Sequence, residues 1–166
     1  MKFLAIDFET ANRRSDSACS VGLIFVDDLK IIKKEHFFIN PGDDWFEFTF
    51  LHKISWNDVK NKPTFGQLWK NILPYFEKAD FAVAHNSGFD KKVLYSCLER
   101  YGIGFSDFDF KCTMRLARNL WKIRPARLSD VCRYFDIELD HHNALSDAVA
   151  CAKIMIKAIE YRKISN

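Results

Sequence analysis

Residues 2–8, KFLAIDF, form a short and almost continuously apolar stretch, which is typical of a strand buried on both faces of a sheet. Outward from it, apolar stretches at 21–26 and 31–39 predict two further strands joined by a short turn. Three consecutive strands with short connections predict an antiparallel meander. A fourth apolar run, FAVA at 81–84, predicts one more buried strand.

The rest of the chain has mainly helical spacing. Apolar residues recur three and four positions apart in five segments, which predict helices at 64–78, 89–101, 113–121, 128–135 and 144–160. Between the strands and these helices, 41–63 predicts a long loop with short helical pieces. This order predicts an α/β fold with a mixed sheet, three antiparallel strands plus parallel ones, flanked by helices. With neither an internal repeat nor a break in composition, we expect a single domain over 1–166.

Composition excludes several classes of protein. Hydrophobic residues make up 48% and charged residues 28%, which is ordinary for a globular chain and excludes a disordered or collagen-like one. No apolar run approaches ~18 residues, so no membrane span is predicted. Asp7 and Glu9 interrupt the first apolar run, so we expect no signal peptide and a cytoplasmic protein. Five scattered cysteines without a CxxC pair fit neither a disulfide framework nor a zinc site.

Four carboxylates lie on one predicted strand and at the starts of two predicted helices. Asp7 and Glu9 are two residues apart on the first strand, so their side chains project from the same face. Asp90 lies on the apolar face of its predicted helix, and Asp147 flanks the apolar face of the last one, five residues after His142. Taken singly, each has an ordinary explanation. A strand end meets solvent, an early-turn Asp complements the helix dipole, and a lone His is usually structural.

Together these residues predict phosphodiester hydrolysis. Carboxylate oxygens without soft ligands suit Mg²⁺ or Mn²⁺. Two such ions can clamp the attacking and leaving oxygens of an in-line phosphoryl displacement. A histidine titrates close to neutral pH and can take the proton of the attacking water, as His142 would here.

The sequence resembles the DEDDh family of 3'–5' exonucleases in three ordered motifs. The motifs are FLAIDFETAN at 3–12, AVAHNSGFDKKVL at 82–94 and HNALSDA at 142–148. Two flanking segments also fit, a His-x-Ile segment within 51–65 and the helix within 128–139. The pattern is most similar to the proofreading exonuclease (epsilon) subunits of bacterial DNA polymerase III, and the resemblance spans about residues 3–160.

The resemblance implies a ribonuclease H-like fold and a two-metal mechanism with Mg²⁺ or Mn²⁺. It implies that Asp7, Glu9, Asp90 and Asp147 are the metal ligands and that His142 is the general base. Of the two adjacent histidines, only His142 has four residues between it and Asp147, so we expect no proton transfer at His141. The product would be a nucleoside 5'-monophosphate released from the 3' end.

Substrate contacts are predicted in two places. By resemblance, Thr10, His85, Asn86 and Phe89 contact the terminal nucleotide, with Phe89 stacking on or wedging against the last base, and His52 is a further candidate. In addition, no acidic residue occurs from 110 to 129. Basic residues spaced 4, 3 and 4 apart there predict one helical face that tracks phosphates or is simply solvated; they are Lys111, Arg115, Arg118 and Lys122.

The same resemblance implies a class of substrate and of partner. We expect nucleic acid as the partner, with single-stranded DNA ends favoured. The alternatives are an RNA-trimming exoribonuclease of the same family and a non-catalytic nucleic-acid-binding module on this fold. The chain ends just after the predicted last helix, so we expect a free-standing enzyme rather than a polymerase-tethered one, with a homodimer as one form. Lys53 replaces the Gly common in the His-x-Ile segment. Glycine adopts backbone dihedral angles that Lys avoids, so the family's backbone conformation cannot be assumed for this loop.

Overall fold

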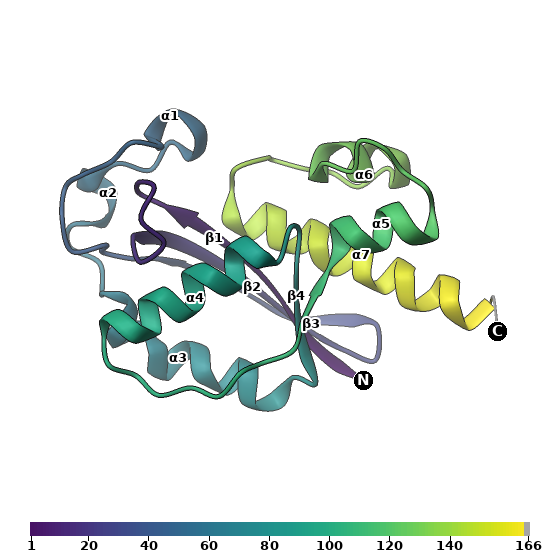
Figure 1. Cartoon of the computed structure of the whole chain (residues 1–166), viewed down its shortest axis with the longest axis horizontal. Coiled ribbons are helices and arrows are strands. Elements are labelled where there is room, and N and C mark those ends of the chain that lie inside the picture. Colours follow the sequence, from purple (N-terminus) through teal and green to yellow (C-terminus); the bar gives the residue numbers. More distant parts are fainter. Residues whose placement is uncertain (165–166) are drawn as a thin grey trace.

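A computed structural model describes the backbone of residues 1–164 and the side chains of residues 1–162. At its centre is a five-stranded mixed sheet in the order β3-β2-β1-β4-β5 (Figure 1). The first three strands form an antiparallel meander, and β4 and β5 run parallel to β1. The strands are β1 (Lys2–Thr10), β2 (Ala18–Asp27), β3 (Lys30–Phe38), β4 (Phe81–Ala84) and β5 (Phe110–Cys112). The predicted fold class is therefore confirmed.

The central strand β1 has apolar side chains on both faces because each face is covered by helices. Phe3 and Ala5 belong to one buried cluster and Leu4, Ile6 and Phe8 to the other. Each of these five side chains is at most 2% exposed. The near-continuous apolar run of β1 thus follows from burial on both sides.

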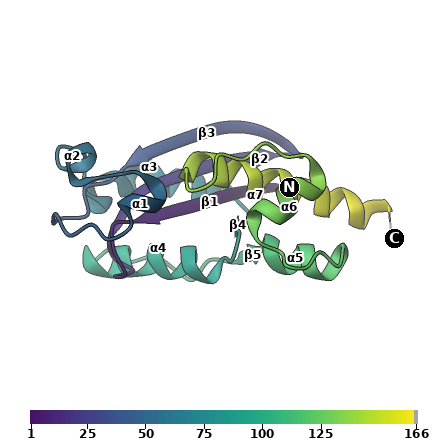
Figure 2. The same cartoon turned by 90° about the horizontal axis from the view of Figure 1, so that it is seen from above.

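The helices form a layer on each face of the sheet, and their ranges match the predicted ones to within a few residues. α3 and α4 pack with one cluster and α5, α6 and α7 with the other (Figures 1 and 2). Two short helices, α1 and α2, lie in the long loop after β3, as predicted. The helices are α1 (Thr49–His52), α2 (Trp56–Val59), α3 (Phe65–Lys78), α4 (Gly88–Arg100), α5 (Thr113–Leu120), α6 (Leu128–Phe135) and α7 (Ala144–Ile164). None of the helices in residues 1–164 is long and apolar enough to cross a membrane.

The sheet is open on one side of β1 at its carboxyl end. The β1–β4 ladder covers only Phe3, Leu4 and Ala5, because β4 has just four residues. Beyond it, β1 continues to Thr10 and pairs only with β2. The last residues of β1 therefore have one backbone edge without a neighbouring strand. This edge is where the predicted metal ligands are found.

Candidate active site at the open end of the first strand

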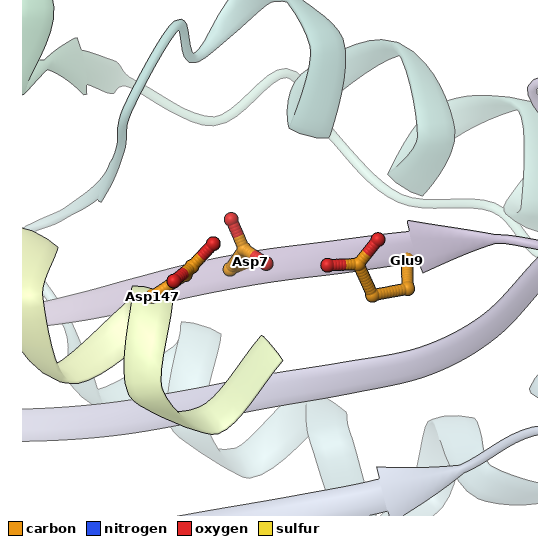
Figure 3. Close-up of side chains that lie close together, drawn as sticks. All are labelled: Asp7, Glu9 and Asp147. Atoms are coloured by element: carbon orange, nitrogen blue, oxygen red, sulfur yellow. The ribbon is translucent and has the colours of Figure 1, made fainter. Parts of the chain in front are cut away.

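Asp7, Glu9 and Asp147 come together beside the open end of β1 (Figure 3). Asp7 and Glu9 follow Phe3 and Ala5 at even spacing, so they lie on the sheet face that α7 covers. Asp147 reaches them from the first turn of α7. One carboxylate oxygen from each lies within 4.8 Å of the other two. Three of the four predicted ligands therefore form one cluster.

Asp147 is held in place by the loop before α7. Its Oδ2 accepts hydrogen bonds from His141 Nδ1 at 2.9 Å and from the His142 backbone N–H at 3.3 Å. Its Oδ1 is buried and has no hydrogen-bond partner in the residues described. A buried carboxylate oxygen without a partner is costly. A cation bound at the cluster would give this oxygen a partner.

Asp90, the fourth predicted ligand, approaches β1 from the opposite layer. Its side chain is 1% exposed, and its Oδ1 accepts a hydrogen bond of 2.9 Å from the Phe8 backbone N–H. That N–H lies on the edge of β1 that β4 leaves uncovered. Asp90 thus supplies the acceptor that a neighbouring strand would have provided, and it ends up beside the other three carboxylates.

The four carboxylates repel one another. Burial and the other three charges raise the pKa of Asp7 well above its ordinary value. Burial, followed by the charges of Asp147 and Asp90, raises the pKa of Glu9 to about 8. Burial also raises the pKa of Asp90, to about 8, against the lowering effect of its hydrogen bond from Phe8. In residues 1–162 no lysine or arginine forms an ion pair with any of them.

These observations fit a divalent metal centre. The cluster offers only hard oxygen ligands, one of them buried without a partner. Cations would offset the burial cost and the repulsion that raise these pKa values. Asp7, Glu9 and Asp147 would hold such ions, with Asp90 close by.

His142 stands beside this cluster, in the loop that leads into α7. Its backbone is left-handed, with φ of 66°, and its ring stacks on that of His141 with 3.9 Å between centroids. His142 lines a cavity of about 280 Å³ together with His36, His52 and His141. Burial, followed by the charge of His141, lowers the pKa of His142. The imidazole is therefore neutral near pH 7 and able to accept a proton.

The contact between His141 and Asp147 was not predicted from the sequence. The adjacent pair of histidines was the available signal, but spacing indicated a role only for His142. In the structure His141 hydrogen-bonds to Asp147 Oδ2, whereas the His142 ring makes no hydrogen bond with the described residues; both histidines line the cavity.

His52 ties the His-x-Ile loop to the end of β1. Its Nδ1 accepts from the Ile54 N–H at 3.1 Å, so its Nε2 carries the proton and donates to the Thr10 carbonyl at 3.1 Å. Lys53 adopts a left-handed backbone with φ of 62°, the conformation that a glycine would take without strain. The loop therefore keeps a glycine-like backbone despite the Lys. The side chain of Thr10 is only 5% exposed.

The other predicted nucleotide contacts lie between β4 and α4. Both ring nitrogens of His85 are engaged, Nδ1 with Thr113 Oγ1 at 2.8 Å and Nε2 with the Ala126 carbonyl at 2.9 Å. A hydrogen bond from His85 to a nucleotide would have to replace one of these. Asn86 is exposed, with φ of 64°, and the Phe89 ring is 45% exposed at the start of α4.

The predicted basic helical face was partly wrong. α5 ends at Leu120, and Lys122 follows in a left-handed conformation with φ of 58°. Lys111 lies on β5, where it pairs with Asp109 at 2.7 Å. The predicted helix, 113–121, matches α5 to within one residue, and Lys111 and Lys122 lie outside it. Only Arg115 and Arg118 share α5.

Comparison with known proteins places this geometry in a family. The family model described as exonuclease (RNase_T) matches residues 4–155. The chain belongs to this exonuclease family. Enzymes of the family hydrolyse phosphodiester bonds, and its DEDDh members use divalent metal ions. The predictions of a phosphodiester hydrolase and of family membership are confirmed.

A relative identified by sequence supports the same family assignment. The chain is 29% identical over 164 residues to a PolC-type DNA polymerase III from Caldanaerobacter subterraneus subsp. tengcongensis. The match covers 96% of this chain and 12% of that polymerase. The exonuclease chain thus spans about an eighth of the relative's length. The resemblance to polymerase III proofreading exonucleases is confirmed at the level of the family.

Solved structures share the fold. Exonuclease X in complex with 5' overhanging duplex DNA superimposes with a TM-score of 0.75 at 22% identity, covering 95% of this chain and 91% of that one. The nuclease domain of 3'hExo, a DEDDh family member bound to rAMP, gives 0.80 at 16% identity, covering 96% and 92%. At these identities the likeness concerns the fold alone.

Proposed function

We propose that residues 1–166 act as one cytoplasmic 3'–5' exonuclease domain that removes nucleoside 5'-monophosphates from single-stranded DNA ends. The observation that carries the proposal is the convergence of Asp7, Glu9 and Asp147 within 4.8 Å, with a buried, unpartnered oxygen on Asp147. Two Mg²⁺ or Mn²⁺ ions held by these carboxylates and Asp90 would lower the pKa of a bound water and stabilise the departing 3'-oxygen.

His142 is the general base in this proposal. Its ring is neutral near pH 7, and His142 lines a cavity together with His141, which binds Asp147. It takes the proton of the attacking water, and Asp147 fixes the loop by accepting the His142 backbone N–H. Because the ring itself makes no hydrogen bond with the described residues, both of its nitrogens remain available for this step.

The terminal nucleotide would enter the cavity of about 280 Å³ beside His142. His52 and the end of β1 at Thr10 form one side of the entrance. Phe89 and Asn86 are exposed at the start of α4, where the Phe89 ring would stack on the last base. Arg115 and Arg118, on α5, would contact the phosphates that follow. His85 would hold the loop after β4 in place and contact the nucleotide with its ring.

DNA is favoured because the relative at 29% identity is a DNA polymerase and Exonuclease X is seen with duplex DNA. The same fold binds rAMP in 3'hExo, so an exoribonuclease is the second candidate. A non-catalytic binding module is disfavoured. Such a module has no need for four carboxylates and a neutral histidine in one place.

The test is hydrolysis of a 5'-labelled single-stranded DNA oligonucleotide, beside its RNA counterpart, in Mg²⁺, Mn²⁺ or EDTA. We expect a metal-dependent ladder that shortens from the 3' end, faster for DNA. Asp28→Asn, which changes an exposed Asp on the turn after β2, is the matched control for Asp7→Asn. A ladder from RNA alone would favour the exoribonuclease. If neither the DNA nor the RNA oligonucleotide is cleaved while the protein still binds Mn²⁺, the result would favour the binding module.

A further inference from the structure

We propose that Gly22 is a positioning residue of this active site. Its lack of a side chain lets the first turn of α7 lie against β2, and this contact sets the distance between Asp147 and Asp7. The inference rests on the proposed function for its kinetic part and on the carboxylate cluster alone for its metal-binding part.

The space at Gly22 is filled by backbone. An ideal Cβ there would overlap the carbonyl oxygen of Ala144 and lie 2.7 Å from the amide nitrogen of Leu145. Both atoms belong to the first turn of α7, and neither can rotate away as a side chain would. The φ of Gly22 lies outside the left-handed region, so glycine is needed for room and not for its backbone freedom.

The other five glycines differ in this respect. At Gly42 and Gly66 a Cβ would meet only side-chain atoms, and at Gly88, Gly102 and Gly104 it would meet nothing within 4 Å. Gly22 is thus the position where a single methyl group must displace main chain. Gly42 and Gly102 instead have positive φ, 93° and 62°, so glycine serves there for its backbone freedom.

β2 is held at Gly22 by a neighbouring strand on each side. Gly22 pairs with Asp7 of β1 on one side and with His36 of β3 on the other. A methyl group at Gly22 would therefore push the first turn of α7 away from the sheet. Since normal carbon contacts are about 3.5–4.0 Å, that turn must move by roughly 1 Å.

The movement would be transmitted to the reacting groups. The Asp147 N–H bonds the Asn143 carbonyl at 2.9 Å, and the His142 N–H bonds Asp147 Oδ2. Asp147 and His142 would thus move as a unit, while Asp7 stays on β1. A misplacement of about 1 Å costs on the order of 10²-fold in rate.

The experiment compares Gly22→Ala with Gly104→Ala, where the added methyl meets open space. Three quantities are measured: Mn²⁺ affinity by electron paramagnetic resonance, kcat and KM on a single-stranded oligonucleotide, and thermal unfolding in EDTA. For Gly22→Ala we expect Mn²⁺ affinity to fall about 10-fold or more. We expect kcat to fall about 30-fold or more with KM within about twofold. Gly104→Ala should match wild type throughout.

A second variant restores the reach of the displaced carboxylate. Asp147→Glu alone adds a methylene and should weaken Mn²⁺ binding. Combined with Gly22→Ala, it should recover at least about threefold of the lost Mn²⁺ affinity, because the longer side chain spans the added separation. Loss of Mn²⁺ affinity in Gly22→Ala would support the inference even if wild type shows no nuclease activity, which would count against the proposed function only.

Two results would overturn the inference. The first is a folded Gly22→Ala protein with wild-type Mn²⁺ affinity and kcat. The second is a Gly22→Ala protein without cooperative unfolding, because the contact would then support the whole fold rather than the geometry of the site.

Discussion

In β1, residues 3–5 pair with a strand on each side, whereas residues 7–10 pair with β2 alone. The first half is wholly apolar, and its side chains are 0% exposed. The second half carries Asp7 and Glu9 on one face. One strand thus changes from core to site over a few residues, and the change coincides with the end of the β4 ladder.

The difference lies in how the backbone of each half is satisfied. In the first half the ladders to β2 and β4 use both edges. In the second half, the Phe8 N–H points to an edge without a strand, and the buried carboxylate of Asp90 accepts it. Where no strand pairs with this edge of β1, the Asp90 carboxylate from α4 therefore accepts the backbone N–H and lies in the site.

Replacing Asp7 at the centre of the cluster should have the largest effect. Asp7→Asn removes a metal ligand, and we expect kcat to fall by roughly 10³-fold or more. The same change removes a repelling charge, so the metal-free protein should gain about 2–4 °C in Tm for each kcal/mol of relieved repulsion. Oligonucleotide hydrolysis and calorimetry in EDTA measure the two effects. Asp28→Asn should change neither, and an active Asp7→Asn would remove Asp7 from the ligand set.

Burial of the carboxylates, together with the same repulsion, predicts a pH dependence for the metal-free wild type. The pKa values of Glu9 and Asp90 are raised to about 8 in the folded chain. Between the ordinary carboxyl pKa near 4 and pH 8, the folded state holds protons that the unfolded state releases, so stability falls as pH rises through this window. We expect Tm in EDTA to decline from pH 5 to pH 8.5 and Mn²⁺ to restore most of it. A Tm that rises over this range would contradict the raised pKa values.

Removing the base should slow the reaction without emptying the metal site. His142→Asn suits the left-handed backbone at this position and removes the imidazole. We expect kcat to fall about 10²–10⁴-fold, with Mn²⁺ affinity within about threefold of wild type. His141→Ala is the comparison. It removes a hydrogen bond to Asp147, so it should weaken Mn²⁺ binding more than His142→Asn does. Reversed results would exchange the roles of the two histidines.

Two substitutions of Asp90 distinguish the effect of its charge from the effect of its hydrogen bond with the Phe8 N–H. Asp90→Asn keeps an oxygen that accepts the Phe8 N–H, whereas Asp90→Ala leaves this buried donor unsatisfied. We expect Asp90→Ala to lower the free energy of unfolding of the metal-free protein by about 1–3 kcal/mol relative to Asp90→Asn. Urea unfolding in EDTA measures the difference. Equal stability would mean that the open edge of β1 does not need this acceptor.

The smallest effect is expected at α5. Arg115→Ala combined with Arg118→Ala should weaken oligonucleotide binding and reduce the salt slope by about 1.4, for two phosphate contacts on a single strand. The double variant Lys33→Ala/Lys34→Ala, on the exposed edge strand β3, is the control. Fluorescence anisotropy at several salt concentrations provides the slopes. An unchanged slope would make Arg115 and Arg118 part of a solvated face only.

Much of the fold was predictable because burial on both faces leaves apolar runs, as in β1 and β4. β5 was missed because it has three residues and lies at the start of a basic segment. The end of α5 was predicted to within one residue, but the left-handed turn at Lys122, which has no glycine to mark it, places Lys122 outside the helix.

The candidate site was predictable where residue type carries the chemistry, as with Asp7, Glu9 and Asp147. Which of two adjacent histidines binds Asp147 depends on the left-handed backbone of His142, which spacing does not show. The link from Asp90 to the Phe8 N–H depends on where β4 ends relative to β1, and that is a property of strand register.

The most direct test of this account is anomalous diffraction from crystals grown with Mn²⁺. The account predicts a peak within coordination distance of Asp7, Glu9 and Asp147, touching the Asp147 Oδ1 that now lacks a partner. It predicts that this peak disappears in Asp7→Asn. A cluster that stays without metal at saturating Mn²⁺, or a peak only among the histidines of the neighbouring cavity, would contradict the claim that the open end of β1 is a metal centre.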